Sequence, residues 1–300
     1  MMLRFLRLTI ARSIPFIVRR FVPNRIYKHL YFQGIFQMRY KGRKLGKIMH
    51  SGTIVENDVY WRGLDHGHEP LSMCLWIEII KKMQPQLILD IGANTGLYGV
   101  VAKNVCPNAS VHFFEPAPAA QNSIFTSLRA NHIYDGAWVH EVFLSDETNP
   151  RKELFVNSPL DLDYIYEGSR ETHSEICIER EVWKLADLFR SKFKELRTDS
   201  IDLVKIDIEG HEFRALKGFE EYLTRNTIFL IEVLDDSAAN KLRNFFSSSD
   251  YLFVNICDDS WTIDIQEELT KSLKWNVLIV PKSKFSVVKD ILLSNIAINL

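Results

Sequence analysis

Short apolar runs alternate with longer segments of helical spacing between residues 87 and 280. Strands are expected at 87–89, 110–115, 138–144, 201–206, 227–233, 251–256 and 275–280, and helices at 96–105, 118–131, 184–193, 211–224 and 237–248. Strands that alternate with helices of this length build βαβ units around a mostly parallel sheet. No strong apolar helical pattern joins the last two strands, so the last strand can run antiparallel. The sequence therefore predicts an α/β fold with a seven-stranded sheet.

Charge is distributed unevenly along the chain. The first 50 residues contain twelve lysines and arginines and no acidic residue, whereas all 38 acidic residues follow them. We expect a basic N-terminal arm at 1–50, a lid or cap segment at 51–84, a single α/β domain at 85–282 and a C-terminal tail at 283–300. Because the body after the arm is acidic, it would repel a phosphate backbone, and we expect no nucleic-acid partner.

The segment 1–21 mixes apolar residues with arginines, which leaves no apolar run long enough to cross a membrane. Three interpretations stay open: a helix that lies on an anionic membrane surface, a mitochondrial-type presequence, and a helix packed on its own domain. The four cysteines form no CxxC pair, which favours a reducing compartment. We therefore expect a cytoplasmic protein, which the first interpretation would place at the inner face of a membrane.

A glycine-containing turn follows the first expected strand. Gly92 and Gly96 have the spacing G-x-x-x-G, and Asp90 comes just before them. A dinucleotide-binding turn usually has the spacing G-x-G-x-x-G, and a carboxylate before the turn suits an amino-bearing ligand better than a pyrophosphate. Glu115 ends the next strand, where an acidic residue can accept both ribose hydroxyls of an adenosine. An adenosine ligand that carries an amino acid and no phosphate is S-adenosylmethionine, and an NAD-dependent oxidoreductase is the remaining alternative.

Three motifs together resemble the FkbM family of S-adenosylmethionine-dependent methyltransferases. They are DIGANTGLY at 90–98, FEP at 114–116 and KIDIEGHE at 205–212. The resemblance implies a class I methyltransferase (Rossmann-like) fold with an antiparallel last strand, and methyl transfer to an oxygen of a sugar or natural-product scaffold. It also implies that Asp90, Gly92, Asn94 and Gly96 line the methionine part of the cofactor. Glu115 would then bind the ribose, and Asp146 would accept from the adenine amine.

Acidic residues gather after the strand expected at 201–206. An alcohol that accepts a methyl group loses a proton, so a base within hydrogen-bond reach assists the transfer. We expect Asp207 nearest the methyl group, Glu209 positioning it or the acceptor, and His211 as a possible base. Glu212 is explained at least as well by the start of the next helix. Residues at i and i+2 on an extended segment point to opposite faces, so we expect no metal ion here.

Further residues could reach an acceptor. Glu232 ends the strand at 227–233 at the same sheet edge, and His68 and Glu69 precede the sheet in a segment that could fold over the cofactor. The insertion 158–173 could form an acceptor-binding rim. The expected substrate is a small molecule, sugar, glycan or glycolipid with a free hydroxyl. A non-catalytic adenosine-binding or scaffold protein with the same fold is the alternative.

Overall fold

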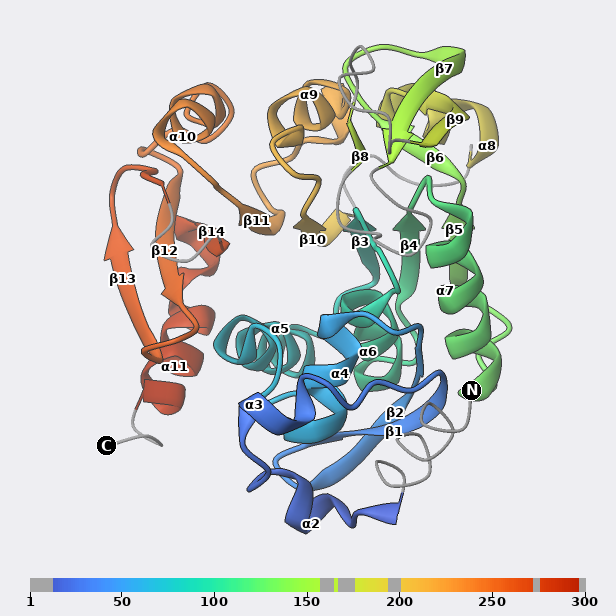
Figure 1. The fold of residues 1–300 in the computed structure, drawn as a ribbon. Coiled ribbons are helices and arrows are strands. Elements are labelled where there is room, and N and C mark those ends of the chain that lie inside the picture. The colour runs from blue at the N-terminus through green and yellow to red at the C-terminus, as the bar shows by residue number, and fades with distance from the viewer. Residues whose placement is uncertain (1–12, 157–164, 167–175, 194–200, 272–275, 297–300) are drawn as a thin grey trace.

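A computed structural model describes residues 13–156, 165–166, 176–193, 201–271 and 276–296. Eight strands form its central sheet (Figure 1). In spatial order they are β13 (Thr262–Gln266), β12 (Tyr251–Cys257), β14 (Asn276–Pro281), β11 (Ile228–Glu232), β10 (Ile201–Ile206), β3 (Leu87–Ile91), β4 (Ser110–Phe114) and β5 (Ala137–His140). Six of the seven expected strands belong wholly to this sheet, and the first part of the one expected at 138–144 does so too.

The pairing confirms the predicted class. Strands β11, β10, β3, β4 and β5 are parallel, and β14 lies antiparallel between β11 and β12. The last strand is therefore antiparallel, as a class I methyltransferase fold requires. The eighth strand, β13, was not predicted. It pairs antiparallel with β12 at the sheet edge, and its side chains are mostly exposed, so the apolar content is too low to mark a strand.

Helices cover both faces of the sheet. Successive strand residues point to opposite faces, and Ile88 belongs to one apolar core whereas Leu87 and Leu89 belong to the other. The first core contains α5 (Pro70–Met83), α6 (Leu97–Val105), α7 (Pro118–Ala130) and α11 (Phe285–Ile296). The second contains α8 (Leu185–Lys192), α9 (Glu212–Lys217), the 3-10 helix η1 (Glu220–Tyr222) and α10 (Asp236–Leu242).

The strand predicted at 138–144 is two strands in different sheets. β5 ends at His140, and β6 (Val142–Leu144) joins a smaller four-stranded sheet in the order β6-β9-β7-β8. The other members are β7 (Asn149–Val156), β8 (Ile165–Tyr166) and β9 (Ile176–Trp183). This sheet lies beyond the carboxyl ends of β3 and β4 (Figure 1). Most of the insertion 158–173 lies outside the described residues.

Three segments predicted outside the α/β domain contain helices or strands that pack on it. The arm predicted at 1–50 includes a hairpin of β1 (Gly34–Tyr40) and β2 (Arg43–His50), which packs on α6 and α7 and buries Met38 and Ile48. The expected cap segment contains α4 (Ile54–Arg62) and also α5, a buried helix in contact with α6 and α11. The expected tail forms α11, preceded by the 3-10 helix η2 (Lys282–Lys284). Apolar burial therefore makes these segments part of the domain.

The described part of the N-terminal arm begins with two short helices, α2 (Phe16–Arg19) and α3 (Asn24–Tyr27), each preceded by a proline. Residues 1–12, and with them most of the segment on which the three interpretations depend, lie outside the described residues. Among the residues that the structure describes, no helix is long and apolar enough to cross a membrane.

Candidate functional site

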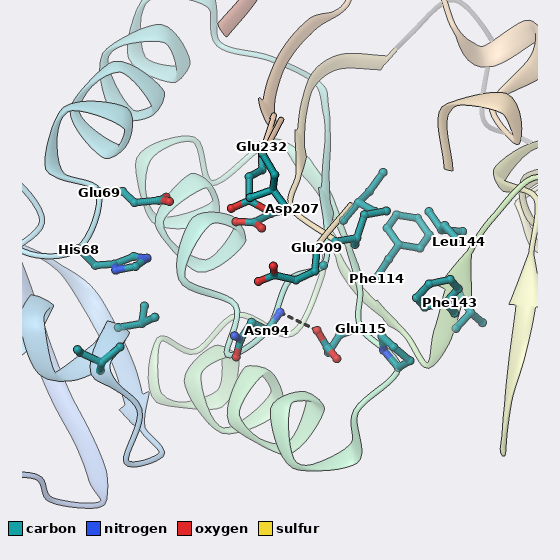
Figure 2. Close-up of a pocket in the computed structure, with 18 residues that line it drawn as sticks. His68, Glu69, Asn94, Phe114, Glu115, Phe143, Leu144, Asp207, Glu209 and Glu232 are labelled. Carbon is teal, nitrogen blue, oxygen red and sulfur yellow. Dashed lines mark hydrogen bonds between the residues drawn. The ribbon is translucent and has the colours of Figure 1, made fainter. Parts of the chain in front are cut away.

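A cavity of about 450 Å³ opens at the carboxyl ends of the parallel strands. Ligands of open α/β sheets bind at this edge. Figure 2 shows that polar side chains from the segments after β3, β4 and β10, and from the end of β11, point into the same space. Five predicted site residues and three weaker candidates lie in its wall. The first are Gly92, Asn94, Glu115, Asp207 and Glu209, and the second are His68, Glu69 and Glu232.

The turn after β3 packs tightly against the chain that leaves β10. Gly92 has φ 73°, and a Cβ built there would lie 1.8 Å from the carbonyl oxygen of Asp207. Only glycine combines this backbone conformation with so close an approach. Gly96 also has a positive φ, and its Cβ would meet the Ile124 side chain at 2.9 Å. Gly92 thus lines the cavity, whereas Gly96 allows α6 to pack against α7.

Glu115 closes the floor of the cavity. Its Oε2 accepts from the backbone N–H of Asn94 at 2.7 Å and its Oε1 from that of Ala117 at 2.8 Å (Figure 2). Burial raises the pKa of Glu115 to about 7, although these two hydrogen bonds oppose the rise. Each carboxylate oxygen keeps a second lone pair, so Glu115 can still accept hydroxyl groups from a ligand.

Asp90 has a different place from the predicted one. It is buried at the end of β3, does not belong to the cavity wall, and its Oδ2 accepts from the backbone N–H of Gly99 at 2.7 Å. Burial raises the pKa of Asp90 to about 7. The prediction that Asp90 lines the cofactor is not supported by this geometry, because its carboxylate is turned toward the first turn of α6. It fixes that turn behind the cavity.

Buried Lys205 forms an ion pair with half-buried Asp207 at the end of β10. Lys205 is 2% exposed, and its Nζ lies 3.1 Å from Oδ2 of Asp207 and 2.8 Å from Oδ1 of Asn276. Burial by itself would lower the pKa of Lys205, but Asp207, Glu69 and Glu232 raise it overall. Lys205 therefore stays charged and holds the Asp207 side chain in the cavity wall.

Glu69 and Glu232 complete the acidic wall around this lysine. Glu69 accepts from the hydroxyl of Tyr98 at 2.6 Å, and Lys205 lowers its pKa against the opposing effect of burial. Burial, and next the charge of Asp207, raise the pKa of Glu232. The two carboxyl groups differ because the charges of Lys205 and His68 outweigh burial at Glu69, whereas burial and the neighbouring carboxylates outweigh Lys205 at Glu232.

Two residues of the KIDIEGHE motif serve the local structure. His211 precedes α9, packs edge-on against Phe143 and is not in the cavity wall, so the geometry does not support it as the base. Glu212 is buried and accepts from the backbone N–H groups of Ile208 and Gly210 at 3.2 and 3.0 Å. It closes the turn that carries Glu209.

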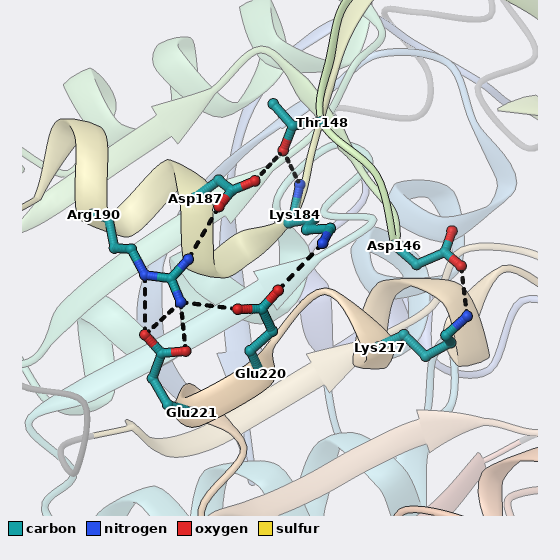
Figure 3. A network of polar contacts seen from close by, with 8 residues as sticks. All are labelled: Asp146, Thr148, Lys184, Asp187, Arg190, Lys217, Glu220 and Glu221. Carbon is teal, nitrogen blue, oxygen red and sulfur yellow. Dashed lines mark hydrogen bonds and ion pairs between the residues drawn. The ribbon is translucent and has the colours of Figure 1, made fainter.

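Asp146 is held away from the cavity. Its carboxylate accepts from Arg214 at 2.6 Å and from Lys217 at 2.9 Å, and Figure 3 shows the second of these pairs beside the surface network of Arg190. Burial by itself would raise the pKa of Asp146, but the hydrogen bonds and charges of Lys217 and Arg214 together lower it. Asp146 is not among the residues that line the cavity, so its contact with adenine stays a prediction.

Apolar residues that the sequence did not mark close the rest of the cavity. Phe143 and Leu144 of β6 line one side, and Ile54 and Val55 at the start of α4 line another. Only Phe114 could have been expected, since it directly precedes Glu115. The residues of β6 and α4 reach the site because the second sheet and the N-terminal segment pack against it, and no local sequence pattern predicts that packing.

The residues present fit an adenosine ligand that carries an amino acid. Gly92 leaves its side of the wall without a side chain, and Glu115 faces the position expected for ribose hydroxyls. The buried Oδ1 of Asn94 has no hydrogen-bond partner among the described residues, which leaves an acceptor for an amino group. Asp207, Glu209 and Glu69 keep the wall negative, as a sulfonium and an ammonium require.

Comparison with known proteins identifies related sequences. A family model described as "Methyltransferase FkbM domain" matches residues 90–253, more than half of the chain. Methyltransferase sdnD of Sordaria araneosa is 29% identical over 168 residues, which cover 47% of this chain and 64% of that protein. The 31-O-demethyl-FK506 methyltransferase FkbM of Streptomyces tacrolimicus is 30% identical over 165 residues, which cover 45% and 60%. The matches thus span less than two thirds of each relative.

Solved structures are more distant. A methyltransferase from Agrobacterium tumefaciens has a TM-score of 0.43 and 10% identity, covering 86% of this chain and 78% of its own. An O-methyltransferase from Bacillus cereus has a TM-score of 0.40 and 11% identity, covering 70% and 81%. Such low scores add nothing to the fold assignment, which depends on the strand order.

Proposed function

Because the chain belongs to the FkbM methyltransferase family, we propose that it transfers a methyl group from S-adenosylmethionine to a hydroxyl oxygen. The observation that carries the proposal is the single cavity in which the Gly92 turn and Glu115 face Asp207 and Glu209. One half of this wall suits the nucleoside, and the other half suits a polar acceptor. The cavity edge is also where open α/β sheets bind ligands.

The bound cofactor supplies a methyl group on a positively charged sulfur. The chain must hold the acceptor oxygen in line with that carbon, about 3 Å away, and must take up the hydroxyl proton. Asp207 is the base that we propose, because it lines the cavity and Lys205 fixes its side chain. Glu209 is the exposed carboxylate at the cavity mouth and would bind the acceptor.

The acceptor class is also a proposal. The name of the Streptomyces relative describes methylation of an oxygen on a natural product. Carboxylates at the mouth of the cavity suit a ligand with several hydroxyl donors, which fits a sugar, glycan, glycolipid or hydroxylated natural product. Phe143 and Leu144 would pack against the apolar face of such a scaffold.

Calorimetry with S-adenosylmethionine tests cofactor binding. We expect the wild type to bind and Glu115→Gln to bind at least about tenfold more weakly, since a ribose hydroxyl that loses a charged acceptor loses roughly 1.5–3 kcal/mol. Glu141→Gln, an exposed carboxylate of the same type outside the cavity, should bind like the wild type. A wild-type protein that binds no cofactor would contradict the proposal.

Methyl transfer needs its own experiment. Extracts incubated with the protein and a deuterated-methyl cofactor should yield a labelled product by mass spectrometry, and Asp207→Asn should reduce its rate. Cofactor binding without any labelled product would favour the alternative function, a non-catalytic adenosine-binding protein.

We further propose that the N-terminal segment contacts an anionic membrane. Four apolar side chains between residues 13 and 30 are 48–71% exposed: Ile17, Val18, Phe21 and Ile26. Exposed cations lie among them, namely Arg20, Arg25 and Lys28, and no acidic residue occurs before residue 51. Exposed apolar groups beside cations are typical of surfaces that bind anionic lipid headgroups.

Sedimentation with lipid vesicles tests this surface. The protein should sediment with vesicles that contain phosphatidylserine, less at high salt, and not with pure phosphatidylcholine. The double variant Ile17→Ser/Phe21→Ser should lose most of the binding. Leu293→Ser removes an exposed leucine of α11 and is the matched control. Equal binding to both vesicle types, or by both variants, would refute the membrane contact.

A further inference from the structure

Three carboxylates from two neighbouring strands meet in the cavity wall. Asp207 follows β10, Glu209 comes two residues later, and Glu232 ends β11. One carboxylate oxygen of each lies within 4.8 Å of the others (Figure 2 shows the three side chains). Oxygens that share one Mg²⁺ lie at most about 4.2 Å apart, so small rotations of these side chains would let one ion contact all three.

The expectation of no metal ion depended on residue spacing in an extended chain, and the backbone in the structure is not extended there. That expectation assumed an extended chain, in which Asp207 and Glu209 point to opposite faces. In the structure Glu209 has φ 53° and Gly210 has φ 92°, both in the left-handed region. The chain therefore bends directly after Asp207 and returns Glu209 to the same side.

Glu232 provides an independent indication of a ligand. It is 8% exposed, lines the cavity, and its Oε2 has no hydrogen-bond partner among the described residues. A buried carboxylate oxygen without a partner is costly, and such groups usually bind a donor or a cation. The nearby ammonium group of Lys205 is bonded to Asp207 and Asn276 instead.

The charges favour a divalent ion. With all three carboxylates ionised, the single charge of Lys205 leaves a net charge of two negative units, and Glu69 in the same wall adds to it. Carboxylate oxygens are hard ligands, which suit Mg²⁺ and Mn²⁺ better than softer metals.

We propose that Asp207, Glu209 and Glu232 bind one divalent cation, Mg²⁺ or Mn²⁺, in the wall of the cavity. Three protein ligands leave coordination positions for water or for acceptor oxygens. The role of the ion in the reaction depends on the proposed function: an acceptor hydroxyl bound to it would lose its proton to Asp207 or to water more readily. Binding of the ion does not depend on that function.

A titration with Mn²⁺ tests the site. The full chain, freed of metal with EDTA and exchanged into metal-free buffer, is titrated with Mn²⁺, and the free ion is measured by electron paramagnetic resonance. We expect one bound ion per chain. Glu232→Gln and Glu209→Gln should each raise the Kd by at least about tenfold, since even outer-shell changes at metal sites cost 10–100-fold. Glu141→Gln should leave it unchanged.

Circular dichroism of each variant checks that it folds. Because Glu209 is exposed, Glu209→Gln should fold, and its Kd for Mn²⁺ can be measured even if Glu232→Gln unfolds. Absence of bound Mn²⁺ in the wild type, or an unchanged Kd in a folded Glu209→Gln, would overturn the proposal. Calorimetry with S-adenosylmethionine in EDTA separates the metal site from the methyltransferase function. Cofactor binding without Mn²⁺ binding refutes only the metal site. Mn²⁺ binding without cofactor binding refutes only the methyltransferase function.

Discussion

Replacing Lys205 by methionine should destabilise the protein far more than replacing a surface lysine. Lys205 is 2% exposed, and its Nζ contacts Asp207 at 3.1 Å and Asn276 at 2.8 Å. Methionine fills a similar volume but leaves buried carboxylates without a counter-charge. Removing one partner of a buried pair costs about 3–5 kcal/mol. We expect a decrease of this size in the free energy of unfolding.

Urea unfolding followed by tryptophan fluorescence measures the effect, with Lys184→Met as the control. Nζ of Lys184 lies 3.3 Å from Glu220 at the surface, and such pairs contribute about 0–1 kcal/mol. The difference between wild type and Lys205→Met should narrow in acid. Lys205 lowers the pKa of Glu69, so this contribution is present above the unfolded pKa of about 4.3 and is lost as pH falls below it.

Two results would refute this reasoning. One is a loss for Lys205→Met no larger than that for Lys184→Met. The other is a difference from wild type that does not change between neutral and acidic pH. Either would mean that Lys205 contributes packing and not charge.

Three further predictions concern the cavity. Gly92→Ala should lower the free energy of unfolding by more than about 1 kcal/mol and abolish cofactor binding in calorimetry. The reason is that its Cβ would lie 1.8 Å from the Asp207 carbonyl oxygen. Normal cofactor binding by this variant would contradict the close packing. Asp146→Asn should leave cofactor affinity within experimental error, and a clear loss would restore its predicted contact with adenine. Cofactor affinity should rise with pH up to the Glu115 pKa of about 7, by at most about tenfold per pH unit, because ribose hydroxyls donate to the ionised carboxylate. Glu115→Gln should remove that rise. A pH profile that is the same in this variant and in the wild type would exclude Glu115 as the ribose ligand.

The central sheet could be predicted because its strands are buried on both faces. Leu87–Ile91 and Ile228–Glu232 are buried throughout, and such continuous apolar runs between helical segments show up in any local window. Strand β13 was missed because an edge strand buries little. The hairpin β1–β2 was assigned to the arm because its basic residues are exposed on one face while the other face packs on α6 and α7.

Part of the site was also predictable, because the carboxyl ends of parallel strands meet at one edge. Gly92, Asn94, Glu115, Asp207 and Glu209 follow those strands and line the cavity. Asp90, Asp146 and His211 occur in the same motifs but lie outside it. Spacing along the chain locates a residue near the edge, but it does not say whether its side chain turns to the cavity, to a helix start or to a neighbouring cation.

The sequence by itself determined the α/β class and the glycine turn with its acidic partner, because these depend on patterns within a few residues. It only allowed the last strand to run antiparallel, and the resemblance to the FkbM family implied it. Tertiary structure alone decided that Lys205 pairs with Asp207 and that Glu232 joins them from another strand. It also decided that the bend at Glu209 brings its side chain to the same side as Asp207, where an opposite side was expected. The approach of Glu232 depends on the packing of β11 beside β10, whereas the pair and the bend depend on burial and on left-handed backbone dihedrals, which residue spacing does not encode.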